Sequence, residues 1–145
     1  MNFYEMWGSS PKDVFAVGQE GMILRYDGAA WSEMSSGTTE RIYGVWGTSS
    51  SDAFAVGGSG TILRYDGNSW SAMSSGTDQA LNSAWGTSAA DVYAVGWPGT
   101  VLHYDGTAWS AMESGTLMRL MAVWGTQGGD VFAVGDHGVI LRGTR

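Results

Sequence analysis

Short runs of aromatic and branched residues alternate with turn-forming residues along the whole chain. One representative stretch reads "RIYGVWG", "DAFAVG", "GTILRYDG" and "SWSAMSS" over residues 41–75, and each run is bounded by Gly, Asp, Asn or Ser. Such runs are typical of β-strands joined by tight turns. No apolar face with helical spacing is long enough to form a helix. We therefore predict four short strands in this stretch and an all-β protein.

The four-run pattern repeats with a constant period of 39 residues, and repeats of this length indicate stacked units. Trp7, Trp46, Trp85 and Trp124 are each 39 residues apart, as are Trp31, Trp70 and Trp109. The repeat units span about 1–37, 38–76, 77–115 and 116–145. The last unit stops where its fourth strand would begin, and Gly143 stands where the other units have Tyr26, Tyr65 and Tyr104. The sequence therefore predicts three four-stranded units and one three-stranded unit.

The runs "DVFAVG" and "GTILRY" are nearly continuous in apolar residues, whereas a sheet wetted on one face alternates apolar and polar positions. Each sheet is thus expected to be covered on both faces. Antiparallel four-stranded units of about 40 residues, packed between identical neighbours, are the blades of a β-propeller. We predict that residues 1–145 form one β-propeller domain, or a segment of one, with about 3.75 blades.

The units resemble bacterial tandem-repeat β-propellers with the pattern W-G-T-S-x-x-D-V-F-A-V-G-x-x-G-T-I-L-x-Y-D-G-x-x-W-S-x-M, and the resemblance covers essentially the whole chain. They are more distantly similar to sialidase-like (Asp-box) and photosystem-assembly-factor propellers. The segments at 26–31, 65–70 and 104–109 resemble the Asp-box turn, with a spacing from Asp to Trp that is one residue shorter. The resemblance implies that the loops between second and third strands, and the connections between units, share one face around a central channel.

An open row of blades would expose the apolar faces of its two end blades, so the sequence predicts a closed ring. A four-bladed monomer is one solution, and a homodimer that forms an eight-bladed ring with two-fold symmetry is the other. Small residues near the predicted axis (Gly44, Ser83, Ala84 and Ala122) suit either ring. Bulky Trp and Phe between 39-residue blades favour the shallower angles of the homodimer.

Positions that recur in every unit are assigned to the scaffold. Two glycines per unit, Gly18 and Gly21 in the first, are expected to frame a hairpin loop with positive φ. The tryptophans Trp7, Trp46, Trp85 and Trp124 are expected to fill the space between blades. Aspartates at two repeat positions are expected to accept backbone N–H bonds in turns. They are Asp13, Asp52, Asp91 and Asp130 before the second strand of each unit, and Asp27, Asp66 and Asp105 after the third strand of the first three units.

Positions that differ between units fall mainly in the loops between second and third strands and in the connections at 38–42, 77–81 and 116–120. Variable loops on a rigid scaffold are typical of a binding surface, although solvated loop tips also vary without a function. Trp97 is the clearest candidate for a ligand contact, because an exposed indole can stack on a sugar or anchor a peptide. The alternative explanation for this tryptophan is that it packs against Pro98. The candidate ligand-binding residues are Trp97, Pro98, Gln19, Glu20, Ser59, Asp136 and His137.

Two functions follow from these patterns. The first is a non-catalytic binding module or scaffold for a carbohydrate or a protein, which includes a possible lectin. The alternative is a structural repeat fragment, natural or engineered, that assembles into a ring by dimerisation and has no ligand of its own. The near-identical units indicate recent repeat amplification in either case.

Composition and candidate chemistry narrow the functions further. A formal net charge of −7 argues against nucleic acid and anionic membranes as partners. The chain has no cysteine, and its two histidines, His103 and His137, occupy different repeat positions. One aspartate per turn does not form a calcium cage, so we predict no metal site. No catalytic arrangement or cofactor-binding motif emerges from the residues, so we also predict no cofactor and no enzymatic activity. No signal peptide or membrane-spanning run is visible, so the compartment stays open, with an extracellular or cell-surface location allowed for a fragment.

Overall fold

The computed structural model describes residues 1–144, which form three four-stranded antiparallel sheets and one three-stranded sheet. Blade 1 contains β1 (Phe3–Ser10), β2 (Asp13–Gly18), β3 (Ile23–Tyr26) and β4 (Trp31–Met34). Blade 2 contains β5 (Ile42–Ser49), β6 (Asp52–Gly57), β7 (Ile62–Tyr65) and β8 (Trp70–Met73). Blade 3 contains β9 (Leu81–Ser88), β10 (Asp91–Gly96), β11 (Val101–Tyr104) and β12 (Trp109–Met112). Blade 4 contains β13 (Leu120–Gly125), β14 (Asp130–Gly135) and β15 (Ile140–Thr144).

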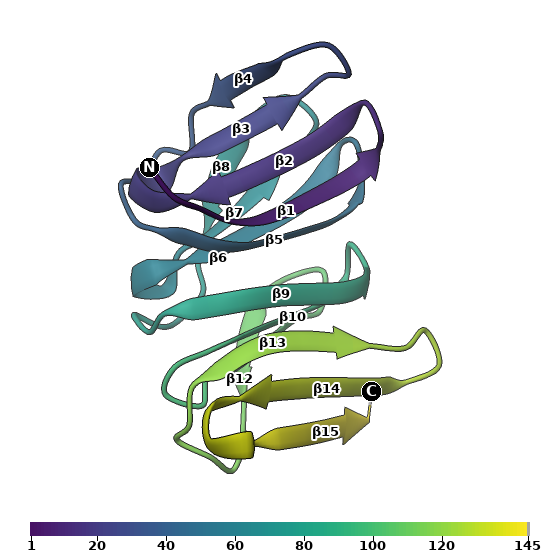
Figure 1. Cartoon of the computed structure of the whole chain (residues 1–145). Helices are drawn as coiled ribbons and strands as arrows, with labels where there is room; N and C mark the ends of the chain where they lie inside the picture. Colours follow the sequence, from purple (N-terminus) through teal and green to yellow (C-terminus); the bar gives the residue numbers. More distant parts are fainter. Residues whose placement is uncertain (145) are drawn as a thin grey trace.

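The strands of each blade pair in chain order, as in a meander, so the first strand and the last strand are the two edges of the sheet. The blades stand in a curved row, with the first and last blades at opposite ends (Figure 1). The innermost strands β1, β5, β9 and β13 contact one another in sequence along the row. Three-residue 3-10 turns join the second and third strands in blades 1, 2 and 4: η1 (Gln19–Gly21), η2 (Gly58–Gly60) and η3 (Asp136–Gly138). The predicted blade organisation, including the three-stranded last blade, is confirmed.

Apolar cores lie between consecutive blades, and this is why the strands read as almost continuous apolar runs. At the first interface Phe15 and Ile23 of blade 1 pack on Ala53, Leu63 and other residues of blade 2. The same positions, one period later, build the interface of blades 2 and 3, and the interface of blades 3 and 4 follows the same pattern. Two faces are therefore buried in each internal blade, as expected for a sheet with neighbours on both sides.

The repeated tryptophans and glycines fit together at each interface. A Cβ atom added to Gly47 would lie 2.6 Å from the ring of Trp7, and Gly86 and Gly125 meet Trp46 and Trp85 in the same way. The indole of one blade thus lies against the backbone of the next, which only glycine permits. The rings of Trp7, Trp46 and Trp85 therefore lie between consecutive blades.

The two glycines of each hairpin loop have different roles, which corrects one prediction. Gly21 and its equivalents adopt positive φ, as expected, but Gly18, Gly57 and Gly135 are extended, with φ of −162°, −165° and −167°. Close backbone contact explains the glycine there: a Cβ on Gly57 would lie 2.1 Å from the carbonyl oxygen of Arg41. The positive φ belongs instead to the residue before the second glycine, namely Glu20, Ser59 and His137.

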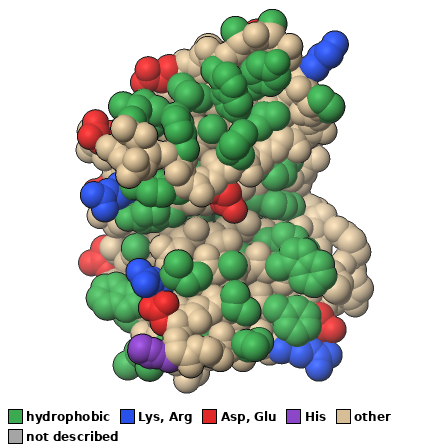
Figure 2. Space-filling view, viewed as in Figure 1, with side chains coloured by type: hydrophobic (Ala, Val, Ile, Leu, Met, Phe, Trp, Pro, Cys, Tyr) green, Lys and Arg blue, Asp and Glu red, His purple; other side chains and the backbone are tan. Residues whose placement is uncertain are grey.

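The row of blades is open in this single chain, because the outer faces of both end blades are exposed. On blade 4, Trp124 is 60% exposed and Ile140 71%. On blade 1, Met6 is 58% exposed and Phe3 46%. Figure 2 shows hydrophobic side chains over both ends of the row. The chain alone is therefore an arc and not a closed four-bladed ring. Within residues 1–144, no helix is long and apolar enough to cross a membrane.

Candidate functional site

The loops between second and third strands lie beside the connections between blades, along one face of the arc. In each blade the backbone links them: the N–H of Gly58 donates to the carbonyl of Arg41 at 2.9 Å, and the N–H of Trp97 donates to that of Ala80 at 3.0 Å. Equivalent bonds join Gln19 to Asn2 and Asp136 to Arg119. Both variable regions of the sequence therefore form one surface, the loop face.

A pocket of about 400 Å³ opens on the loop face between blades 2 and 4. Its wall includes Trp97 and Asp136 from the loops, which brings two of the predicted binding residues together. The indole of Trp97 is 53% exposed, so its ring is available to a ligand. We call this cavity the loop-face pocket; it is lined by Tyr43, Ala80, Asn82, Trp97, Arg119, Met121 and Asp136.

The loop-face pocket combines apolar surface with one ion pair. Nε of Arg119 lies 3.2 Å from a carboxylate oxygen of Asp136, and both side chains are substantially exposed at 51% and 40%. Asn82 is held in place because its side-chain amide donates to the carbonyl oxygen of Leu120 at 2.8 Å. An exposed ion pair of this kind contributes little to stability, so its charges remain available for recognition. The arrangement offers an aromatic platform beside one positive and one negative group.

The other predicted binding residues lie elsewhere on the loop face. Pro98, whose peptide bond with Trp97 is cis, lines a separate pocket with Glu113 and Leu117. Glu20 lines an acidic hollow of about 620 Å³ with Glu33 and Glu40. The side-chain oxygen of Gln19 accepts a hydrogen bond from the N–H of Asn2, and the hydroxyl of Ser59 donates one to Glu40. His137 is exposed at a turn. The structure thus unites Trp97 with Asp136 and separates the other five.

Sequence reasoning missed the strand residues that form part of the pocket. Tyr43, Asn82 and Met121 occupy the same position in β5, β9 and β13, and Tyr4 is their equivalent in β1. The rings of Tyr4 and Tyr43 lie 5.3 Å apart between centroids. The comparison of units that singled out Trp97 would also have found this position, because its residue changes from blade to blade. The prediction overlooked it because it considered the loops and the connections between units, whereas this position lies inside a strand.

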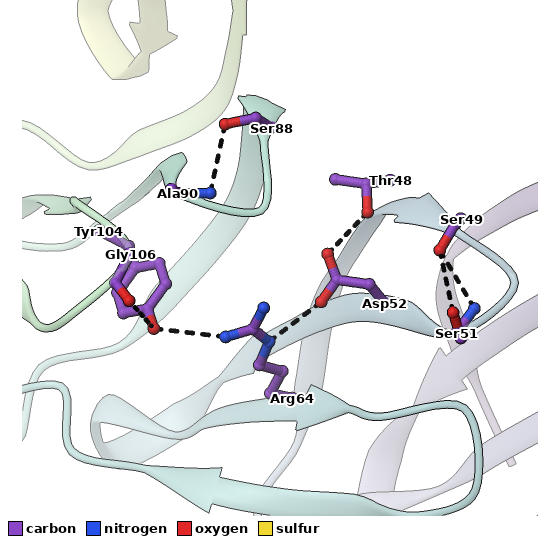
Figure 3. A network of polar contacts seen from close by, with 9 residues as sticks. All are labelled: Thr48, Ser49, Ser51, Asp52, Arg64, Ser88, Ala90, Tyr104 and Gly106. Carbon is purple, nitrogen blue, oxygen red and sulfur yellow. Dashed lines mark hydrogen bonds and ion pairs between the residues drawn. The ribbon is translucent and has the colours of Figure 1, made fainter.

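A second polar network recurs at the blade interfaces and involves the aspartates before each second strand. Asp52 accepts from Thr48 and from Nε of Arg64, which lies 3.0 Å from the carboxylate, and Nη1 of Arg64 donates to the hydroxyl of Tyr104 at 3.3 Å (Figure 3). The same bonds join Ser9, Asp13, Arg25 and Tyr65. These aspartates thus bind side chains, where backbone N–H groups were expected. The network connects strands and blades and belongs to the scaffold.

His103 belongs to this scaffold network as well. It stands at the repeat position of the arginines, its Nε2 lies 2.8 Å from Asp91, and its ring lies 4.5 Å from that of Tyr93. The arginines likewise sit at successive interfaces and do not converge on the axis, as a sialidase-like site would require. No group of three or more metal-ligating side chains occurs within residues 1–144.

The aspartates after the third strands form tight turns as predicted. The carboxylate of Asp66 accepts the backbone N–H groups of Asn68 and Ser69, both at 2.8 Å, and Asp27 and Asp105 do the same in their blades. These N–H bonds lower the pKa of Asp27, Asp66 and Asp105 because they favour the charged form. Burial raises the pKa of Glu5, and a bond from the N–H of Val45 opposes the rise.

Solved structures of β-propellers superpose on almost the whole chain. YCF48 from Cyanidioschyzon merolae matches with a TM-score of 0.75 and 17% sequence identity, over 98% of this chain and 53% of the YCF48 chain. YCF48 bound to D1 peptide matches with a TM-score of 0.73 and 14% sequence identity, over 99% of this chain and 53% of that chain. The WD40 propeller domain of Doa1 matches with 0.82 at 11% identity over 97% and 50%. An ancestral GH74 enzyme matches with 0.75 at 15% identity over 97% and 22%. No family model and no curated protein sequence matches the chain.

These similarities establish the fold: the chain is built as a β-propeller. The chain spans about half the length of the YCF48 and Doa1 propellers on which it superposes. The neighbours include a protein with a bound peptide and an enzyme, which is consistent with the general rule that one fold supports many functions. Function must therefore be argued from the loop-face pocket and the end faces.

Proposed function

We propose that the chain is a non-catalytic binding module that takes a segment of a protein partner in the loop-face pocket. The observation that carries this proposal is the meeting of Trp97 with the Arg119–Asp136 ion pair around one cavity of about 400 Å³. Tryptophan and arginine are the residues most enriched among the energetic centres of protein interfaces. The pocket supplies both on a rigid scaffold.

The shape and chemistry of the pocket favour a peptide segment. Trp97, Tyr43 and Met121 offer apolar surface to a side chain of the partner. The charges of Arg119 and Asp136 match a backbone or side chain that presents a donor and an acceptor together. Support from the fold comes from YCF48, a propeller of similar shape that binds a D1 peptide. Glycan stacking on Trp97 is the other ligand chemistry that this indole allows.

The proposal is tested by selection from a displayed random peptide library, followed by affinity measurement with synthetic peptides. We expect peptides that bind the chain and lose about 30-fold in affinity in Trp97→Ala, since truncation of such an anchor costs about 2 kcal/mol. Leu117→Ala is the control, because Leu117 is 77% exposed and lies outside the loop-face pocket and outside both end faces. A glycan array run in parallel distinguishes the lectin alternative. Peptides indifferent to Trp97→Ala, or a signal from glycans alone, would contradict the proposal.

Self-association is a second candidate function, favoured by the exposed apolar faces at both ends of the arc. We propose that the chain closes into a ring as a homodimer. A soluble monomer rarely presents such extended apolar surface. Because a dimer that binds through these faces is stabilised by mass action, its thermal midpoint rises with protein concentration. A midpoint that stays constant over a hundredfold range of concentration would contradict self-association and leave the binding module unaffected.

A further inference from the structure

The arginine–tyrosine contact between blades is present at two of the three internal interfaces and replaced as a pair at the third. Nη1 of Arg25 donates to the hydroxyl of Tyr65 at 2.8 Å, and Arg64 reaches Tyr104 in the same way (Figure 3). At the interface of blades 3 and 4 the arginine position holds His103 and the tyrosine position holds Gly143. Arginine and tyrosine thus occur together or are both absent.

Each end of the arc carries one half of this contact. Arg142 on β15 pairs with Asp130 at 3.0 Å, as the other arginines pair with their aspartates, but its side chain is 64% exposed because no other blade of this chain covers it. Tyr26 on β3 occupies the tyrosine position of blade 1, which within residues 1–144 has no neighbouring blade on that side to supply an arginine. The two unmatched halves are therefore complementary to each other.

The apolar surfaces at the two ends of the arc are also complementary, because they repeat the two faces that pack together at the interface of blades 1 and 2. The outer face of blade 4, with Trp124, Val134 and Ile140, repeats the face that Trp7, Val17 and Ile23 present to blade 2. The outer face of blade 1 carries Phe3, Met6 and Trp31, which are equivalent to Ile42, Val45 and Trp70 of blade 2. Since the internal interfaces show what covers each face, the partner of the blade 4 face is a blade 1 face.

We propose that a second copy of this chain docks head to tail, with blade 4 of each copy on blade 1 of the other and Arg142 bonded to Tyr26 across both interfaces. This inference rests on the self-association proposed above and identifies its surfaces. Two copies are the smallest number whose end faces can all be covered, and one copy spans about half the length of the YCF48 and Doa1 propellers on which it superposes. The assembly is a closed ring of eight blades. An interface between two blade 4 faces would instead contain two arginines and no tyrosine at these positions.

Two charge variants test the direction of docking, because each disables one face only. Trp124→Glu alters the blade 4 face and Met6→Glu the blade 1 face, both at exposed positions where the fold of the single chain is preserved. Trp97→Glu is the control, since Trp97 is a similarly exposed aromatic residue away from both end faces. Mass in solution is measured by sedimentation velocity for each variant alone and for equimolar mixtures, with circular dichroism as the check on folding.

The head-to-tail ring makes a distinctive prediction for the mixture. Each variant alone is a monomer, because both of its interfaces are disrupted, whereas Trp97→Glu stays dimeric. Mixed together, the intact blade 4 face of Met6→Glu binds the intact blade 1 face of Trp124→Glu, and a heterodimer forms. If one variant alone remains dimeric, like faces pair and the head-to-tail ring is wrong. If both remain dimeric, the chain self-associates through another surface; if the unmodified chain is monomeric, self-association itself fails.

Conservative substitutions then test the Arg142–Tyr26 contact. Tyr26→Phe and Arg142→Met are each expected to raise the dissociation constant of the dimer at least tenfold, because a hydrogen bond to a charged group is lost at both interfaces. The double variant is expected to be no weaker than the more affected single variant, since both remove the same bond. Additive effects of the two substitutions would overturn the proposed contact, and unchanged dissociation constants would do the same.

Discussion

The contact between Arg25 and Tyr65 gives a prediction for the stability of the arc. Tyr65 is only 1% exposed, and Nη1 of Arg25 donates to its hydroxyl at 2.8 Å. Tyr65→Phe removes this acceptor and leaves the ring in place. A hydrogen bond to a charged group contributes about 1.5–3 kcal/mol when it is buried. Because the Arg25 side chain is 30% exposed and water replaces part of the bond, we expect a loss of about 1 kcal/mol.

The assay is urea unfolding followed by tryptophan fluorescence and far-UV circular dichroism, whose transitions must coincide for a free energy to be assigned. All measurements use a Trp124→Glu background, in which the proposed ring does not form. The matched control is Tyr26→Phe, at the equivalent position of blade 1, where no other blade of this chain supplies an arginine. We expect this control to change the free energy of unfolding by less than about 0.5 kcal/mol.

A double-mutant cycle with Arg25→Lys separates the pair contact from other effects. Lysine retains a charge for Asp13 but lacks the planar fork with which arginine binds Asp13 and Tyr65 at once. The coupling energy between positions 25 and 65 is expected to be about 1 kcal/mol. The reasoning is refuted if Tyr65→Phe costs no more than Tyr26→Phe, or if the coupling energy is indistinguishable from zero.

Three further predictions concern turns and protonation. Gly57→Ala is expected to lower the free energy of unfolding by about 2 kcal/mol or more, because its Cβ would lie 2.1 Å from the backbone oxygen of Arg41. Gly128→Ala is expected to be neutral in the same urea assay, because its Cβ would lie 3.9 Å from the hydroxyl oxygen of Thr126. Burial raises the pKa of Glu5, so the contribution of this residue to stability is fully present below its unfolded pKa and is lost as pH rises through the folded pKa. Glu5→Gln should therefore gain stability relative to the parent as pH rises above 4.5, the ordinary pKa of a glutamate, in the same urea assay. The lowered pKa of Asp66 has the opposite consequence. The contribution of its carboxylate to the free energy of unfolding is present above the unfolded pKa and is lost as pH falls through the folded pKa. The deficit of Asp66→Asn, measured by urea unfolding, should therefore be large at neutral pH and shrink in acid; a pH-independent deficit would contradict this.

The sequence was sufficient to predict the blades because local and global signals agree. The 39-residue period places the same turn residues at the same points of every unit, and the continuous apolar runs require a neighbour on both faces. Turn aspartates such as Asp66 were predictable for the same reason, since an aspartate two or three residues before the N–H groups it binds is a local motif.

Contacts between distant residues were not predictable in the same way. The pairing of Asp52 with Arg64 depends on the register of two strands, and the bond from Arg64 to Tyr104 depends on how one blade packs on the next. Likewise, Gly57 is required by a backbone oxygen 16 positions earlier in the chain and not by its own φ. The loop-face pocket was predicted only in part, because Tyr43 and Asn82 reach it from strands whose relative placement the repeat pattern does not specify.

The mass of the unmodified chain in solution tests most directly the claim that the repeat leaves two complementary end faces. Light scattering over a range of concentrations is expected to give twice the chain mass of 15.4 kDa, with dissociation to the monomer only on dilution. A mass of 15.4 kDa at every concentration up to the high micromolar range would contradict the account. A mass that grows without limit would also contradict it, because head-to-tail contacts that do not close produce an open filament.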